Sequence, residues 1–125
     1  PLAEMAIRVN LEGDHEGAKP VTEHVIILST APTRTEAEAI ARALVEEGLA
    51  ACVQMRAIDS VYRWEGSVEQ AAEVALQIKT RAARANEVSA RIATLHSYDV
   101  PEIVVIPVVG GSPAYLGWID EAVGG

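Results

Sequence analysis

Residues 50–80 read AACVQMRAIDSVYRWEGSVEQAAEVALQIKT, and this stretch decides the fold. Its first half, residues 50–64, contains neither Gly nor Pro and alternates in places between apolar and polar side chains, which predicts one long strand. Glu65-Gly66-Ser67 predicts a hairpin turn, because Gly-Ser supplies the positive φ that such a turn needs. Residues 68–80 predict the returning strand, with Val74, Leu76 and Ile78 on one face. The centre of the chain is therefore expected to be a long antiparallel hairpin.

Before the hairpin, the sequence predicts one strand and one helix. Residues 25–29 form a continuous apolar run, typical of a short strand buried on both faces. Thr35 and Glu38 have the spacing of a capping box and predict the start of a helix, and Gly48 predicts its end. The sequence thus predicts a strand followed by a helix on the N-terminal side of the hairpin.

After the hairpin, the sequence predicts a second helix over 82–96 and a last strand over 103–109, followed by a third helix over 114–123. Pro107 lacks a backbone donor, so we expect it at a sheet edge or at the end of pairing. The whole order is βαββαβ with an extra C-terminal helix. It predicts an α+β fold, a ferredoxin-like sandwich in which one antiparallel sheet carries two helices on one face.

The two hairpin arms are about twice as long as the outer strands, which fall within the usual range of strand lengths. The overhang cannot be covered by the sheet of the same chain, and a two-stranded ribbon alone in water is marginally stable. Pairing with another copy would bury the apolar groups near its tip. The alternative is a ribbon that bends back over its own domain. We expect an oligomer, because the two helices already occupy one face of the sheet.

The composition limits the number of domains, the partners and the compartment that we expect for this protein. The 125 residues suit one domain, which we expect over residues 24–125, preceded by an acidic, flexible N-terminal extension over residues 1–23. A net charge of −8 argues against nucleic acid or an anionic membrane as the main partner. A single cysteine, with no apolar run long enough to span a membrane and no signal-peptide pattern, favours a reducing compartment and a cytoplasmic location.

Known catalytic motifs are absent from the sequence: there is no Gly-x-Ser-x-Gly, no P-loop and no His-Glu-x-x-His. We therefore expect a protein that is not an enzyme. A distant alternative is acyl-phosphate hydrolysis, because some ferredoxin-like domains use an Arg after the first strand and Arg34 lies near that place. That alternative rests on analogy at the level of the fold.

Five sequence blocks resemble the CutA family in their order and spacing: residues 48–53 (GLAACV), 60–66 (SVYRWEG), 73–80 (EVALQIKT), 96–102 (HSYDVPE) and 115–118 (YLGW). The resemblance runs from about residue 25 to residue 123. It implies a homotrimer in which long hairpins pair across subunits, similar in architecture to the PII signalling trimers. It also implies a role in divalent-cation tolerance, with copper as the cation and no cofactor required, and lateral clefts between subunits that bind something small.

The chain departs from that family at two positions. Some copper-tolerance relatives carry Cys where this chain has Ser29, and a second His where it has Leu95. Here Leu95 is expected to complete the inner stripe of the second helix, and only His96 remains of that copper set. Copper takes imidazole or thiolate ligands, commonly several of them.

The candidate site residues fall into three groups. His96 and Glu102 are the candidate metal contacts, although a histidine at a helix end also bonds nearby carbonyls. Cys52, Lys79 and Tyr98 are candidates for a ligand cleft, where a lone cysteine is more often a small buried hydrophobe and a lysine a surface residue. Tyr62, Trp64, Tyr115 and Trp118 are assigned to the subunit interface. The alternative function is a PII-like signalling trimer, or a scaffold trimer, that binds a small ligand between subunits without metal.

Overall fold

The structure is a computed structural model that describes residues 22–124. The chain forms an antiparallel four-stranded sheet in the order β2-β3-β1-β4, which is the ferredoxin-like α+β architecture that the sequence predicts. Residues 1–21 of the expected extension lie outside the described part. The elements in chain order are β1 (His24–Ala31), α2 (Arg34–Glu46), β2 (Cys52–Trp64), β3 (Ser67–Arg81), the short 3₁₀ helix η2 (Ala82–Arg84), α3 (Ala85–Leu95), β4 (Val104–Pro107) and α4 (Pro113–Val123).

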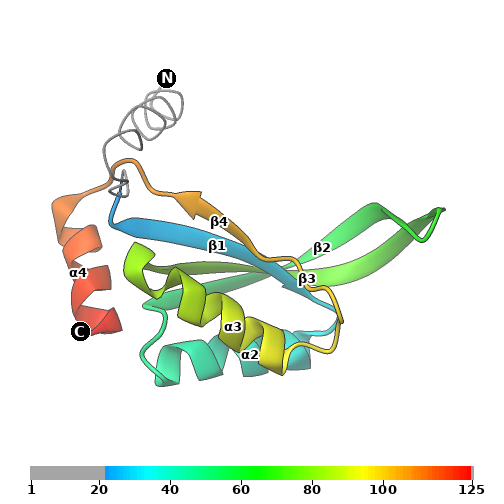
Figure 1. Ribbon diagram of the computed structural model, residues 1–125, viewed down its shortest axis with the longest axis horizontal. Helices are drawn as coiled ribbons and strands as arrows, with labels where there is room; N and C mark the ends of the chain where they lie inside the picture. Colours follow the sequence, from blue (N-terminus) through cyan, green and yellow to red (C-terminus); the bar gives the residue numbers. More distant parts are fainter. Residues whose placement is uncertain (1–21, 125) are drawn as a thin grey trace.

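The core lies between the sheet and the two helices α2 and α3, which cover the same face (Figure 1). Ile27 and Ile78 from the central strands pack there with Leu44 of α2 and Ile92 of α3, and all four are fully buried. Leu95 packs against this cluster, as expected from the inner stripe of the helix. The core is aliphatic, since the chain has no Phe.

The opposite face of the sheet carries no helix. Burial alternates along the first half of β1, where Val25 and Ile27 are buried while Ile26 and Leu28 are only partly covered. The expectation that residues 25–29 are buried on both faces is therefore wrong for the isolated chain. The physical reason is that α2 and α3 lie on one side of the sheet.

Three local predictions are corrected. Helix α2 is capped by Thr33, whose hydroxyl accepts the Glu36 backbone N–H at 3.1 Å, and not by Thr35. The hairpin turn consists of Glu65 and Gly66, both at positive φ, while Ser67 already pairs with Trp64. The last strand spans only Val104–Pro107, because only residues 25–28 of β1 pair with it. Pro107 does lie on an edge strand, as predicted.

The hairpin extends beyond the body of the domain. Strands β2 and β3 have 13 and 15 residues, against eight in β1 and four in β4, and their outer ends form a two-stranded ribbon that projects past the helices (Figure 1). We call residues 58–73 the ribbon, since β3 from residue 74 onward pairs with β1. The ribbon does not bend back over its own domain.

Helix α4 lies at the end of the sheet away from the ribbon tip (Figure 1). Asp120 fixes it there, because one carboxylate oxygen lies 2.8 Å from His24 Nε2 and 3.3 Å from Arg81 Nε. Its inner residues Ile119 and Val123 form a second, smaller apolar cluster with Ala51. This position brings the outer side of α4 next to the ends of β2 and β3.

Candidate functional site

His96 is the residue that directly follows α3, and its imidazole is fully buried. Its Nε2 lies 2.5 Å from the carbonyl oxygen of Thr30, and its Nδ1 accepts the backbone N–H of Tyr98 at 3.0 Å. An Nδ1 that accepts a hydrogen bond carries no proton, so this geometry assigns the proton to Nε2, which donates to Thr30. Both ring nitrogens are thus engaged inside the chain.

Glu36 holds the segment that follows His96. Its carboxylate accepts hydrogen bonds from the backbone N–H of Ser97 at 2.9 Å and from the Ser97 hydroxyl at 3.0 Å. The same carboxylate oxygen lies 3.4 Å from His96 Nδ1. Glu36 was missed as a site residue, although its place three residues after Thr33 is a capping-box spacing that marks the start of α2.

Tyr98 connects this segment to the base of the ribbon. Its hydroxyl donates a 2.9 Å hydrogen bond to the carboxylate of Glu73, and its ring lies 4.8 Å from the ring of His96. Burial of the phenol, together with the hydrogen bond to Glu73, raises the pKa of Tyr98 to about 12. The hydroxyl therefore stays protonated and acts as a donor at neutral pH.

The metal candidates differ in their surroundings, since the imidazole of His96 is buried and Glu102 is exposed. Within residues 22–124, no group of three or more His, Cys, Asp or Glu side chains is placed to hold a metal ion. A cation site built on His96 within one chain would need a ring nitrogen that already makes a hydrogen bond. The donor set of the described single chain therefore does not fit a closed metal site.

Cys52 and Lys79 are brought together as cross-strand partners in β2 and β3. The Lys79 ammonium group donates to the Tyr115 hydroxyl at 3.4 Å and lies 5.3 Å from the centre of the Tyr115 ring. Trp118 stands one helical turn further along α4, with its ring 5.4 Å from that of Tyr115. We call Cys52, Lys79, Tyr115 and Trp118 the α4-end cluster.

The third predicted cleft residue, Tyr98, is not part of the α4-end cluster. It contacts Glu73, which precedes Lys79 by six positions on β3, a separation of about 20 Å along a strand. Two predicted interface residues, Tyr115 and Trp118, lie in the α4-end cluster. The other two, Tyr62 and Trp64, lie in the ribbon, where Trp64 is 53% exposed. The sequence-predicted residues thus fall into separate regions.

Comparison with known proteins resolves the family. The model of the CutA1 divalent ion tolerance protein family matches residues 25–122. The chain belongs to this family. It is 45% identical over 100 residues to the divalent-cation tolerance protein CutA of Archaeoglobus fulgidus, an alignment that covers 80% of this chain and 98% of that protein. It is 39% identical to the chloroplastic protein CutA of Arabidopsis thaliana, covering 86% of this chain and 59% of that longer protein.

Solved CutA structures share the fold. The periplasmic divalent cation tolerance protein CutA of Archaeoglobus fulgidus superposes with a TM-score of 0.80 at 44% identity, covering 81% of this chain and 99% of that one. The divalent cation tolerance protein of Thermus thermophilus gives 0.78 at 41% identity, covering 81% and 99%. Among the described helices of this CutA-family chain, none has the length and apolar character that crossing a membrane requires.

Proposed function

We propose that this CutA-family protein acts in divalent-cation tolerance as a homotrimer, and that it binds copper through groups that come together only on assembly. The observation that carries assembly is the ribbon, whose Val61 and Val68 are 67% and 65% exposed beside Tyr62 and Trp64. Exposed apolar side chains gathered on an unsupported ribbon are a poor surface for a monomer in water. Copies of the chain that pair with the ribbon would cover them.

The open sheet face supports the same proposal. Ile26 and Leu28 of β1, with Val104 and Ile106 of β4, are incompletely covered on the side without helices. A sheet with one bare apolar face gains by packing against a second layer. A homotrimer supplies that layer without a further partner. The net charge of −8 attracts cations and repels the anionic surfaces of nucleic acids and membranes, so it supports cations as the ligands.

The cation part of the proposal also depends on assembly. His96 and Glu102 are the proposed contacts, but His96 has both nitrogens in internal hydrogen bonds. Copper bound there would need the imidazole to release Tyr98 or Thr30 and would need donors from more than one chain. We propose binding without catalysis, in the cytoplasm, where the lone Cys52 stays reduced.

The test combines native mass with copper titration on one sample. We expect light scattering to give three times the mass of the chain, and calorimetry to show copper binding that His96→Ala and Glu102→Gln each weaken. Glu102→Gln is the sharper variant, because Glu102 is exposed while His96 also bonds to Thr30. A trimer that binds no copper would leave the assembly proposal intact and overturn the copper proposal.

Assembly is tested separately by substitution in the ribbon. We expect Trp64→Ser to lower the native mass on dilution, because it removes an exposed aromatic anchor. Val45→Ser is the matched control, since Val45 is 43% exposed but lies on α2, away from the ribbon. Equal effects of both substitutions would count against the ribbon as the interface.

A second candidate function is a PII-like trimer that binds a small ligand between subunits without metal. The α4-end cluster favours it, because a lysine beside two aromatic rings offers a cation and stacking surfaces at one place. Loss of a bound metabolite in Lys79→Gln, with copper binding unchanged, would favour this function over the first.

A further inference from the structure

The body of the sheet and the ribbon differ in charge. We call residues 24–31, 52–57, 74–81 and 104–107 the sheet body. It contains no Asp or Glu, and its basic side chains are those of His24, Arg56, Lys79 and Arg81. The ribbon has one arginine, Arg63, and four carboxylates, those of Asp59, Glu65, Glu69 and Glu73. In a chain with a net charge of −8, the sheet body is therefore a surface that attracts the acidic ribbon of another copy.

We propose that the ribbon of one copy lies across the open sheet face of the next copy, with Glu69 of the ribbon paired to Arg56 of the sheet body. The proposal rests on the homotrimer proposed above and names the two surfaces that meet in it. Each copy then gives a ribbon to one neighbour and receives a ribbon from the other. A head-to-tail contact of this kind can close a ring of three copies.

Strand alternation places Arg56 and Glu69 on the same side of the hairpin. Leu76 of β3 is buried in the core under the helices, so its neighbour Ala75 faces the open side. Arg56 is paired with Ala75 and therefore faces the open side as well. Tyr62 lies six positions further along β2 on this side and is paired with Glu69. The side of the ribbon that carries Glu69 thus continues the open face that carries Arg56.

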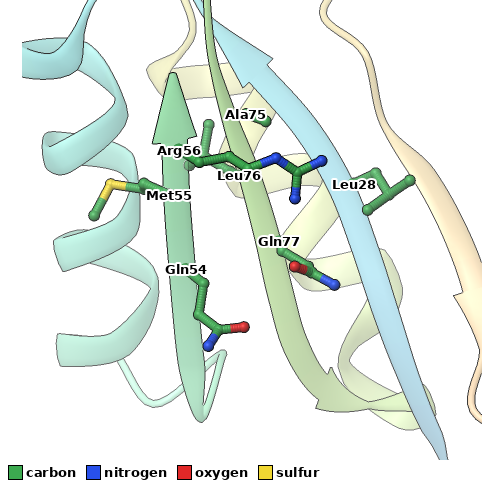
Figure 2. A pocket seen from close by; sticks show the side chains of 7 residues that line it. All are labelled: Leu28, Gln54, Met55, Arg56, Ala75, Leu76 and Gln77. Atoms are coloured by element: carbon green, nitrogen blue, oxygen red, sulfur yellow. The ribbon is translucent and has the colours of Figure 1, made fainter. Parts of the chain in front are cut away.

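Figure 2 shows the side chains that the ribbon of the next copy meets on the open face. Arg56 extends from β2 across β3 toward Leu28, whereas Met55 points away, toward α2. The amides of Gln54 and Gln77 lie on the same side as Arg56 and border with it a hollow of about 280 Å³. One guanidinium group, two amides and an apolar side chain offer hydrogen bonds and packing to side chains inserted from a second copy.

The charge of Arg56 is not neutralised by the part of the chain that the structure describes. The ion pairs made by arginines within residues 22–124 are those of Arg42, Arg81, Arg84 and Arg91. The two other strongly basic residues of this face already contact α4. Lys79 lies 3.4 Å from the Tyr115 hydroxyl, and Arg81 lies 3.3 Å from the Asp120 carboxylate. Arg56 is therefore the cation of this face that an incoming carboxylate can pair with.

Glu69 is the carboxylate of the ribbon that suits Arg56. It is exposed and takes part in none of the ion pairs within residues 22–124. Asp59 faces the other side of the ribbon, Glu65 lies in the turn, and Glu73 already accepts the Tyr98 hydroxyl. Packed sheets lie about 10 Å apart, a gap that two long side chains bridge from opposite sides. A guanidinium and a carboxylate that meet there form two parallel hydrogen bonds.

The ribbon also matches the open face in length and apolar character. Its arm in β2, residues 58–64, is about 23 Å long, and the part of β2 in the sheet body, residues 52–57, is about 20 Å long. Tyr62 and Trp64 are exposed on the side of the ribbon that carries the proposed carboxylate. Packed on Leu28 of the next copy, their rings would cover apolar surface that one chain leaves in water.

The charge pattern opposes the two other ways in which these surfaces could meet. Two ribbons side by side would bring four carboxylates from each copy together. Two sheet bodies face to face would bring their basic side chains together. Like charges that face each other across an interface cost free energy and suppress the wrong pairing. Ribbon on sheet body is the arrangement that joins opposite charges.

The experiment uses light scattering on the full-length protein at the urea concentration that dissociates half of the wild-type trimer, so that a tight assembly still responds. We expect Arg56→Glu and Glu69→Arg each to raise the apparent dissociation constant by about tenfold or more, because like charges then face each other. The chain with both substitutions restores the pair in reverse and should return to within about threefold of the wild type. Arg42→Glu is the matched control, since it makes the same charge change at an exposed side chain of α2, across the sheet from the open face. It should stay within about twofold.

Recovery in the double variant supports the Arg56–Glu69 pair, and loss without recovery overturns it. Equal losses in Arg56→Glu and Arg42→Glu would show a general charge effect and also overturn it. A wild-type trimer that is insensitive to Arg56→Glu would overturn this inference and leave the proposed homotrimer standing, whereas a monomeric wild type would overturn both.

Neutral substitutions repeat the measurement if charge reversal impairs folding. We expect Arg56→Gln and Glu69→Gln each to weaken the trimer, and the combined variant to be little weaker than either one, because both remove the same pair. Losses that simply add would contradict a direct contact between these two side chains.

Discussion

The Tyr98 hydroxyl donates to the Glu73 carboxylate at 2.9 Å and so joins the segment after α3 to the base of the ribbon. The two residues are 25 positions apart in the chain and belong to different layers of the fold. The same segment is held on its other side by Glu36 through Ser97. The base of the ribbon is thus linked to the body of the domain by a side-chain contact as well as by the sheet.

Removing the Tyr98 hydroxyl should cost stability. We expect Tyr98→Phe to lower the free energy of unfolding by about 1 kcal/mol at neutral pH, because a partly exposed hydrogen bond to a carboxylate is lost. Urea unfolding at fixed protein concentration measures this loss. Tyr62→Phe is a control on the ribbon, since the Tyr62 hydroxyl makes no hydrogen bond within residues 22–124. Equal losses in both variants would contradict a specific role for the Tyr98–Glu73 bond.

The same bond predicts a dependence on alkaline pH. The pKa of Tyr98 is raised from 10.0 to about 12 in the folded chain, so folding favours the protonated phenol. Its contribution to stability is fully present below pH 10 and is lost as the pH rises toward 12. The stability difference between the wild type and Tyr98→Phe should therefore shrink over this interval. A difference that stays constant up to pH 12 would show that the phenol titrates normally.

The order of strands and helices could be predicted from the sequence, because period-two and helical patterns are local and are separated by Gly and Pro. The site could be predicted only in fragments. Glu36 with Ser97 and Tyr98 with Glu73 join residues 61 and 25 positions apart, and no local pattern encodes such pairs. The pairing of Cys52 with Lys79 follows once the turn is placed at Glu65-Gly66. The three-residue turn predicted from the sequence would instead shift the strand register by one residue.

The position of the N-cap shows how two overlapping patterns can mislead. Thr33 with Glu36 and Thr35 with Glu38 have the same spacing, and only the first pair starts α2. We expect Thr33→Ala to lower the free energy of unfolding by about 1 kcal/mol, because the Glu36 N–H loses its acceptor. Thr35→Ala, in the first turn of the same helix, should change it by only a few tenths. The reverse order in chemical denaturation would contradict the assigned cap.

The tip of the ribbon carries a strained residue. Glu65 has a φ of 48° in a two-residue turn with Gly66, a position where Asn is favoured. We expect Glu65→Asn to raise the free energy of unfolding by about 0.5–1 kcal/mol. Glu69→Asn on β3 removes the same charge at a strand position, where Asn is disfavoured, and should give no gain. A similar gain in both variants would indicate that relief of charge repulsion, and not of backbone strain, is responsible.

Two buried hydroxyls on neighbouring strands should respond in opposite ways to substitution. Thr80 donates to the Leu49 carbonyl at 2.6 Å, whereas the Ser29 hydroxyl is buried with no hydrogen-bond partner among residues 22–124. We expect Thr80→Val to lower the free energy of unfolding by about 1–2 kcal/mol, because the carbonyl loses its donor. Ser29→Ala should leave it unchanged or raise it by up to about 1 kcal/mol, since an unpaired polar group leaves the core. Thermal and urea unfolding of the two variants at one protein concentration measure this contrast. A loss in Ser29→Ala as large as in Thr80→Val would contradict an unpaired Ser29 hydroxyl and would show that it has a hydrogen-bond partner inside the core, such as a buried water.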